Sequence, residues 1–264
     1  MSNSDIRVVP GPANYFSHPG SLERLSDFFS ADQLSRAVWV YGERALAGAE
    51  PFLPAAFHLP EAKKIPLYRP LQRTRRGGAG AGLKVTTRAV VDWRRRRRAA
   101  RQRESAGPPP GGTAWWPSRL SPPPARLGRR CRCGIGDAGQ ALNFEIFDDA
   151  NFLVLVEPRI ILNAPAEYLL AGIGDTLAKW YEAVVLAPQP EALPLTVRLG
   201  INGALAIRDV LLASSETALA DQRRGDLTQA FRDVVEAIIA GGGMVGGLGE
   251  RYTRVAPPMR CTTD

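Results

Sequence analysis

Histidine and cysteine are scarce in this chain, which has two His and three Cys among 264 residues. Cys131 and Cys133 are one residue apart and Cys261 lies near the end, so neither a disulfide framework nor a four-ligand zinc ribbon is predicted. Both histidines, His18 and His58, come early. A site built from several histidines is therefore not expected in the later part of the chain.

Long hydrophobic runs are also missing. No apolar stretch approaches the roughly 18–20 residues that a membrane helix requires. The start, Met1 to Arg7, is polar and lacks the apolar segment of a secretory signal. The hydrophobic content of 45% fits a globular protein with one large core or two smaller ones. We therefore expect a cytoplasmic protein without a membrane partner.

Acidic residues are nearly absent from one tract, residues 69–133. It holds 17 Arg and one Lys against Asp92 and Glu104, a net charge of +16. The whole chain carries +8, so the other residues together carry −8. The pI near 9.9 therefore describes a basic, Pro/Gly-rich insert in a modestly acidic globular protein.

Residues 6–68 alternate between strand and helix patterns. Short strands are predicted at 6–9, 37–41 and 65–68, with helices at 21–29, capped by Ser21, and at 44–52. Such alternation predicts an open α/β sheet, whose ligands bind at the carboxyl ends of the strands. Gly42 and Glu43 follow one such strand. The Glu43 carboxylate could accept hydrogen bonds from a ribose, or it could be an exposed loop residue.

Regular strand and helix patterns resume in the sequence after Asp137. Residues 142–147 and 152–156 alternate like strands, and Pro165 opens a helical region with further helices at 195–212 and 227–240. The fold class is therefore an α/β N-terminal domain followed by an all-helical C-terminal domain, which suggests two lobes with a cleft between them.

Two motifs in the helical region are ambiguous on sequence alone. Asp175 lies in a largely apolar stretch, where an acid is costly unless it caps a helix, pairs with a cation or binds a metal. After Gly-x-Gly, a helix N-cap is the simplest interpretation. The glycines at 241–249 suggest a phosphate loop, but they follow a helix rather than a strand. Close helix packing or a flexible connection is the better interpretation.

Three segments, 11–15, 148–152 and 170–182, resemble the glycerol dehydrogenase branch of the iron-containing alcohol dehydrogenases, nearest to its bacterial hydroxycarboxylate dehydrogenases. The resemblance covers roughly 5–68 and 136–255. It implies an N-terminal nucleotide-binding domain, a helical domain, an NAD(P) cofactor and a zinc or iron ion. It also implies hydride transfer to or from a small polyol or a 2-hydroxy acid.

The resemblance also assigns individual residues. It matches Asp175 to the family's metal-ligand aspartate, and Glu43, after Gly42, to the acid near the adenosine ribose. The family's two other metal ligands are histidines, and neither His18 nor His58 lies on a matching motif. The family's glycine turn for the pyrophosphate is also absent, because Arg94 to Arg98 stand in its place. No catalytic residue is therefore assigned.

A shift of reading frame explains both departures. With suitable G+C-rich codons, residues 93–101 read one base later give G-V-G-G-G-A-L-L-D. Read one base the other way, residues 118–125 give V-P-T-I-A-A-T-C, and residues 257–264 give A-A-H-A-V-H-N-G, the family's histidine block. All three match the family in order and place. We predict a dehydrogenase gene translated partly out of register, and an inactive product that binds neither cofactor nor metal as the intact family does.

The domain boundaries follow from this hypothesis. We expect the start of the α/β domain at 1–68, an out-of-frame disordered tract at 69–135 and a return of the α/β domain at 136–164. A truncated helical domain follows at 165–256, with an out-of-frame tail at 257–264. The alternative function is non-enzymatic binding of nucleic acid or another polyanion by the Arg-rich tract, whose Trp93, Trp115 and Trp116 could stack on bases.

Overall fold

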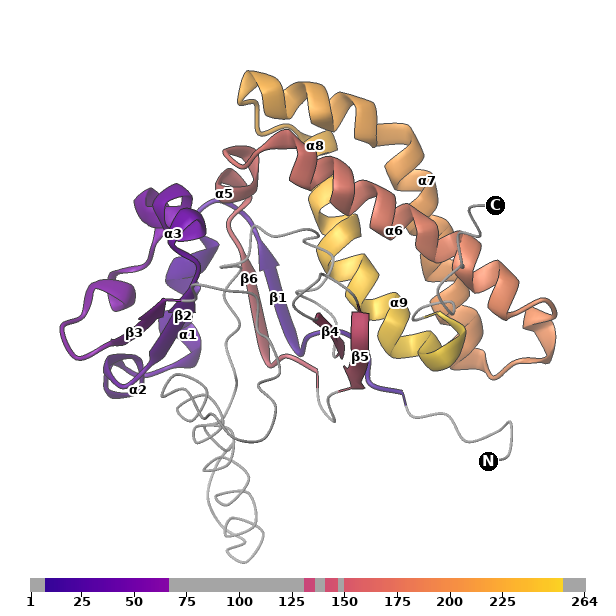
Figure 1. Ribbon diagram of the computed structural model, residues 1–264, viewed down its shortest axis with the longest axis horizontal. Coiled ribbons are helices and arrows are strands. Elements are labelled where there is room, and N and C mark those ends of the chain that lie inside the picture. The colour runs from indigo at the N-terminus through magenta and orange to yellow at the C-terminus, as the bar shows by residue number, and fades with distance from the viewer. Residues whose placement is uncertain (1–7, 67–130, 136–140, 147–149, 254–264) are drawn as a thin grey trace, which may run out of the picture.

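The computed structural model describes residues 8–66, 131–135, 141–146 and 150–253 (Figure 1). The described chain begins with alternating strands and short helices and ends in long helices, which confirms the predicted fold class. Most of the Arg-rich tract, the segment 136–140 and the tail 257–264 lie outside the described residues. Residues 131–135, which the domain prediction assigned to the tract expected to be disordered, form a strand.

The elements of the first part are short. The strands are β1 (Asn14–Ser17), β2 (Val38–Tyr41), β3 (Lys63–Pro66), β4 (Cys131–Ile135), β5 (Ala141–Ile146) and β6 (Leu153–Val156). The helices are η1 (Ser21–Arg24), α1 (Leu25–Phe28), α2 (Ala31–Ser35), α3 (Glu43–Ala49), η2 (Glu50–Phe52) and η3 (Ala55–His58). A capping box holds the start of α2, where Ser30 and Gln33 exchange side-chain and backbone hydrogen bonds.

The described strands pair in twos. β1 pairs with β6 and β2 pairs with β3, both in parallel, while β4 and β5 are antiparallel. The strand predicted at 6–9 is wrong for its described residues, because Val8 and Val9 form no strand and β1 begins at Asn14. The expectation relied on the apolar run before Pro10, but the segment that pairs with β6 comes after the Pro10–Pro12 turn, with Asn14 opposite Leu153.

β6 joins two hydrophobic cores. All four of its residues are buried, as expected for a parallel strand covered on both faces. Leu153 and Leu155 belong to the core of the α/β part. Val154 and Val156 belong to the core of the helical part. Because successive side chains on a strand point to opposite faces, one four-residue strand serves both lobes, and Figure 1 shows the β1–β6 pair between them.

The helical part consists of long helices joined by short turns. They are α5 (Pro158–Leu162), α6 (Ala166–Leu186), η5 (Pro190–Ala192), α7 (Leu195–Arg224), α8 (Gln229–Glu236), the π-helix η6 (Ala237–Gly241), α9 (Gly242–Gly249) and η7 (Glu250–Tyr252). α7 runs twelve residues beyond the predicted end at 212. It ends at Gly225, whose φ of 77° is a left-handed cap.

Glycines let α9 approach its neighbours closely. A Cβ on Gly247 would lie 2.2 Å from the carbonyl oxygen of Val9, and one on Gly200 of α7 would lie 2.8 Å from the Gly249 nitrogen. Real Cβ atoms do not come so near, so only glycine fits at these points. The glycines at 241–249 therefore serve close helix packing, as the sequence suggested, and not a phosphate loop.

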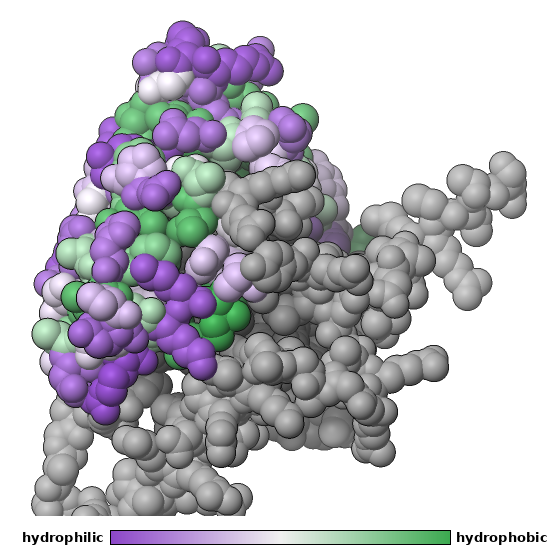
Figure 2. Space-filling view, turned by 60° about the vertical axis from the view of Figure 1, so that its left-hand side comes forward, coloured by the Kyte–Doolittle hydropathy of each residue, from purple (hydrophilic) through white to green (hydrophobic). Residues whose placement is uncertain are grey.

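The surface mixes polar and apolar residues. On the face seen in Figure 2, hydrophobic residues reach the surface between hydrophilic ones. Within the described residues, no helix is both long enough and apolar enough to cross a membrane.

Candidate functional site

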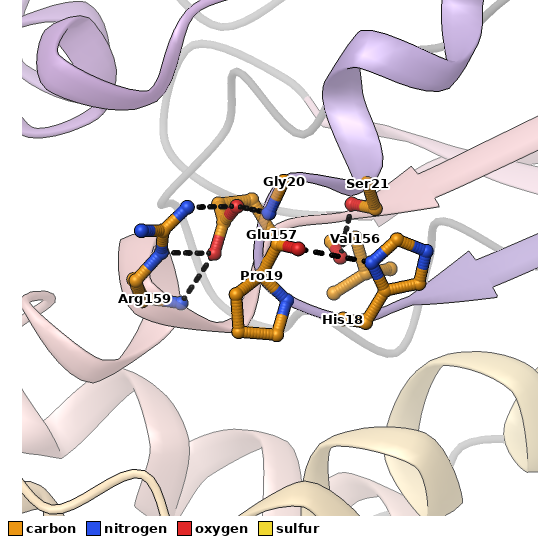
Figure 3. A network of polar contacts seen from close by, with 7 residues as sticks. All are labelled: His18, Pro19, Gly20, Ser21, Val156, Glu157 and Arg159. Carbon is orange, nitrogen blue, oxygen red and sulfur yellow. Dashed lines mark hydrogen bonds and ion pairs between the residues drawn. The ribbon is translucent and has the colours of Figure 1, made fainter.

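A buried carboxylate lies at the carboxyl ends of the paired strands β1 and β6. Glu157 directly follows β6 and its side chain is 1% exposed. It accepts a hydrogen bond from the Gly20 N–H at 2.6 Å and two from the Arg159 guanidinium at 2.8 Å (Figure 3). The carboxylate therefore ties the turn after β1 to the turn after β6 (Figure 3).

The electrostatics of Glu157 follow from these contacts. Burial by itself would raise the pKa of the Glu157 carboxyl, but hydrogen bonds from Arg159 and Gly20, with the Arg159 charge, hold the pKa below its ordinary value. Arg159 also lies over the ring of Phe52, 4.7 Å from its centroid. Glu157 therefore stays ionised at neutral pH and acts as a fixed structural group rather than as an acid or base.

Ser21 does not cap a helix as the sequence predicted. The residue before η1 is Gly20, which makes no side-chain cap. The Ser21 hydroxyl instead donates a 2.6 Å hydrogen bond to the carbonyl oxygen of Val156 (Figure 3). A capping serine needs a free hydroxyl beside the helix N–H groups, and here that hydroxyl is used to hold the end of β6.

Gly42 and Glu43 lie where the sequence placed them, between a strand and a helix. Gly42 follows β2, and Glu43 is the first residue of α3. Both therefore stand at the carboxyl end of a parallel strand, the edge at which open α/β sheets bind ligands. A small apolar cavity between β2 and α3 is lined by Trp39, Val40, Tyr41, Ala45, Leu46, Ala49 and Phe57.

Asp175 is not a helix N-cap. It lies in the interior of α6, nine residues after the helix begins at Ala166, so this interpretation of the sequence is wrong. The Gly-x-Gly pattern suggested a helix start, but the glycines at 172 and 174 are themselves helical. The Asp175 residue is exposed. An exposed acid in mid-helix requires no capping explanation.

The described residues do not fit the family's metal ion. A catalytic zinc site usually takes three protein ligands. Among the described residues, no three His, Cys, Asp or Glu side chains gather where one ion could be held. His18, whose Nδ1 is 3.0 Å from the Pro19 carbonyl oxygen, follows β1, and His58 ends η3. Within the described part of the chain, Asp175, His18 and His58 therefore do not form a group of three ligands.

Sequence reasoning missed two buried polar residues next to Asp175. Thr176 is 1% exposed and Lys179 is 2% exposed, and both lie on the buried face of α6. A lysine within an apolar helical stretch was the signal that could have found them. Glu157 was missed as well, although an acid directly after a fully apolar strand is an equally visible signal.

Comparison with known proteins gives a consistent family of relatives. The chain is 57% identical over 271 aligned positions to hydroxycarboxylate dehydrogenase A of Escherichia coli, covering 97% of this chain and 70% of that protein. It is 36% identical over 101 residues to a glycerol dehydrogenase of Thermotoga maritima, covering 36% of this chain and 28% of that protein. No model of a protein family matches the chain.

Solved structures share the fold. A probable glycerol dehydrogenase from Sinorhizobium meliloti superposes with a TM-score of 0.61 at 18% identity, covering 92% of this chain and 67% of that one. The glycerol dehydrogenase of Schizosaccharomyces pombe gives 0.60 at 17% identity, covering 97% and 65%. The chain thus spans about two thirds of the length of these structures.

Proposed function

Because the chain belongs to the iron-containing alcohol dehydrogenase family, in its glycerol dehydrogenase-like branch, we propose that its parent enzyme transfers a hydride between NAD(P) and the CH–OH group of a small 2-hydroxy acid or polyol. The observation that carries the proposal is the 57% identity to hydroxycarboxylate dehydrogenase A over 97% of the chain. We place the protein in the cytoplasm.

Gly42 and Glu43 are the proposed contacts for the cofactor. A carboxylate at the carboxyl end of a parallel strand can accept hydrogen bonds from the hydroxyls of a ribose. The position after β2, at the first residue of α3, supports this role. Asp175 is the proposed counterpart of the family's metal ligand, although the described residues supply no complete ligand set around it.

The chain as it stands is proposed to have no appreciable dehydrogenase activity. Five consecutive arginines, Arg94 to Arg98, stand where the resemblance places a glycine turn, and long side chains keep the backbone N–H groups away from a pyrophosphate. The chain also has only two histidines. Partial translation in the wrong reading frame accounts for both features, and it rests on the three segments that regain family motifs after a one-base shift.

Turnover by the purified full chain tests the proposal. The assay follows NADH or NADPH by absorbance with lactate, glycerol or pyruvate, in the presence of Zn²⁺ or Fe²⁺. The matched control is the product of the gene after its reading frame is restored. We expect turnover only from the restored protein. Turnover by the chain as it stands contradicts the proposed inactivity, and a restored protein without activity contradicts the proposed parent function.

A further inference from the structure

Helix α7 turns one face toward the rest of the helical lobe. α6, α8 and α9 all contact α7, and Figure 1 shows α6 running alongside it. The apolar side chains that α7 buries share that face, and they are Val197, Ile201, Ala204, Ile207, Leu211 and Ala218. The packing of the lobe therefore uses one side of this 30-residue helix.

A second stripe of uncharged residues (the outer stripe) runs along the other side of α7. Its residues follow one another at intervals of three or four positions, which places them on one helix face. All of them are exposed: Leu195, Leu199, Asn202, Ala206, Val210, Ala213 and Thr217. Leu195 is 62% exposed and Leu199 is 48% exposed. A largely apolar surface that extends for about 33 Å along a helix is typical of a site of protein contact.

Two opposite charges border the outer stripe along one edge. Arg198 and Glu216 are both exposed and are eighteen residues apart, about five helical turns, so they stand on the same side of α7. Ala206 lies next to the midpoint between them. The helix therefore carries a positive charge near the start of the stripe, a small residue at its middle and a negative charge near its end.

This order is complementary to itself when two copies of α7 run antiparallel. With Ala206 opposite Ala206, Arg198 of each copy meets Glu216 of the other. The same alignment packs Leu199 of each copy against Ala213 of the other. A parallel pair would instead set Arg198 against Arg198 and Glu216 against Glu216, and like charges repel. A small residue at the crossing lets the two helix axes approach closely.

We propose that the outer stripe is the interface of a twofold dimer of this chain, formed by two antiparallel α7 helices that cross at Ala206. The two pairs between Arg198 and Glu216 fix the direction of the helices. Burial of Leu195 and Leu199 on both copies stabilises the association. The proposed dimer is independent of the proposed function, because no residue of the stripe is assigned to cofactor, metal or substrate.

Sedimentation velocity of the purified full chain, over about a 100-fold range of concentration, tests the interface because a dimer forms by mass action. We expect a concentration-dependent equilibrium between monomer and dimer. Leu199→Glu places a charge in both halves of the interface and is expected to raise the dimer Kd at least about 100-fold. Leu212→Glu is the matched control, because Leu212 is a 64% exposed leucine of the same helix that lies roughly a third of a turn away from the outer stripe. It is expected to leave the dimer Kd unchanged.

Exchange of the two charges separates this interface from non-specific association. Arg198→Glu and Glu216→Arg each set like charges against one another, and each is expected to raise the dimer Kd about 3- to 10-fold. The double variant restores both pairs with their signs reversed, so its Kd should return to within about 3-fold of the parent value. Circular dichroism checks that every variant keeps its helices, and if Leu199→Glu does not, the charge exchange carries the test.

A chain that stays monomeric at every concentration overturns the proposed dimer, and the outer stripe is then left to a different protein partner. Association that Leu199→Glu leaves unchanged also overturns it and assigns the contact to another surface, such as the Arg-rich tract, which all the variants retain. A double variant that associates no better than the single ones contradicts the antiparallel alignment.

Discussion

Removing the Glu157 carboxylate is expected to destabilise the junction between the lobes more than an ordinary surface change would. Glu157 is 1% exposed and accepts hydrogen bonds from the Gly20 N–H, the Arg159 N–H and the Arg159 guanidinium. In Glu157→Ala the Gly20 N–H loses its acceptor, which costs about 1–3 kcal/mol. The Arg159 side chain is 41% exposed, so its guanidinium can hydrogen-bond to water when the carboxylate is removed. The lost ion pair therefore adds about 1 kcal/mol or less to the destabilisation.

The expected cost of Glu157→Ala is therefore about 1–4 kcal/mol of unfolding free energy. Glu157→Gln keeps one acceptor oxygen for Gly20 and is expected to cost about half as much. Equilibrium unfolding in urea, followed by circular dichroism, measures both variants. Asp27→Ala is the control, because its ion pair with Arg24 is exposed on both sides and is worth at most about 1 kcal/mol.

The pH dependence gives an independent check on Glu157. Its pKa is lowered in the folded protein, so its stabilising effect is present above the unfolded pKa of about 4.3 and is lost as pH falls through the folded value. The difference in unfolding free energy between the parent chain and Glu157→Gln should therefore have its largest value at pH 7 and decrease only below about pH 4. An unfolding free energy of Glu157→Ala within about 0.5 kcal/mol of that of the parent chain at pH 7, roughly the effect of a neutral surface change, would contradict this role of Glu157.

Three further predictions follow from other parts of the molecule. Burial raises the pKa of Tyr15 to about 12, against the influence of the Ser17 hydroxyl. Between about pH 10 and pH 12 the Tyr15 phenol therefore keeps its proton in the folded protein and loses it in the unfolded chain. Over this range the unfolding free energy should fall by about 1.4 kcal/mol per pH unit. Urea unfolding at pH 8 and pH 11 should show a smaller loss for Tyr15→Phe, and an equal loss would contradict the assigned burial effect. Gly247→Ala should destabilise by more than 2 kcal/mol (a rough figure for a forced backbone clash), because the new Cβ meets the Val9 carbonyl oxygen at 2.2 Å. Gly174→Ala, with nothing within 4 Å of its Cβ in the interior of α6, should instead stabilise by up to about 1 kcal/mol, and thermal melting that reverses this order would refute the close approach. Finally, if the Arg-rich tract binds polyanions, fluorescence anisotropy with single-stranded DNA should show affinity that falls steeply between 50 and 200 mM salt (roughly the range in which released counterions dominate), whereas salt-independent binding would exclude that mechanism.

Local sequence signals determined much of the fold. Apolar runs bounded by Gly and Pro located β2 and β6, and the spacing of apolar residues located α6 and the start of α7. The position of Gly42 and Glu43 at a strand end followed from the same pattern. Family membership was also readable from the chain alone, because the motif around Asp175 is continuous in sequence.

Contacts between distant segments decided the rest. β1 could not be located from its own residues, because its strand character depends on pairing with Leu153–Val156 about 140 positions later. Ser21 looked like a cap until the carbonyl oxygen of Val156 came within hydrogen-bond distance. Asp175 looked like a helix start because Gly-x-Gly usually breaks helices, and tertiary packing overrode that weak propensity.

The family, the fold class and the unusual charge of the basic tract can be read from the amino-acid sequence, since each depends on residues near one another in the chain. Which polar residues are buried depends on the folded arrangement of distant segments. Burial is set by what packs against a side chain, and for Lys179 and Thr176 the packing partner is Gly242, more than sixty positions away.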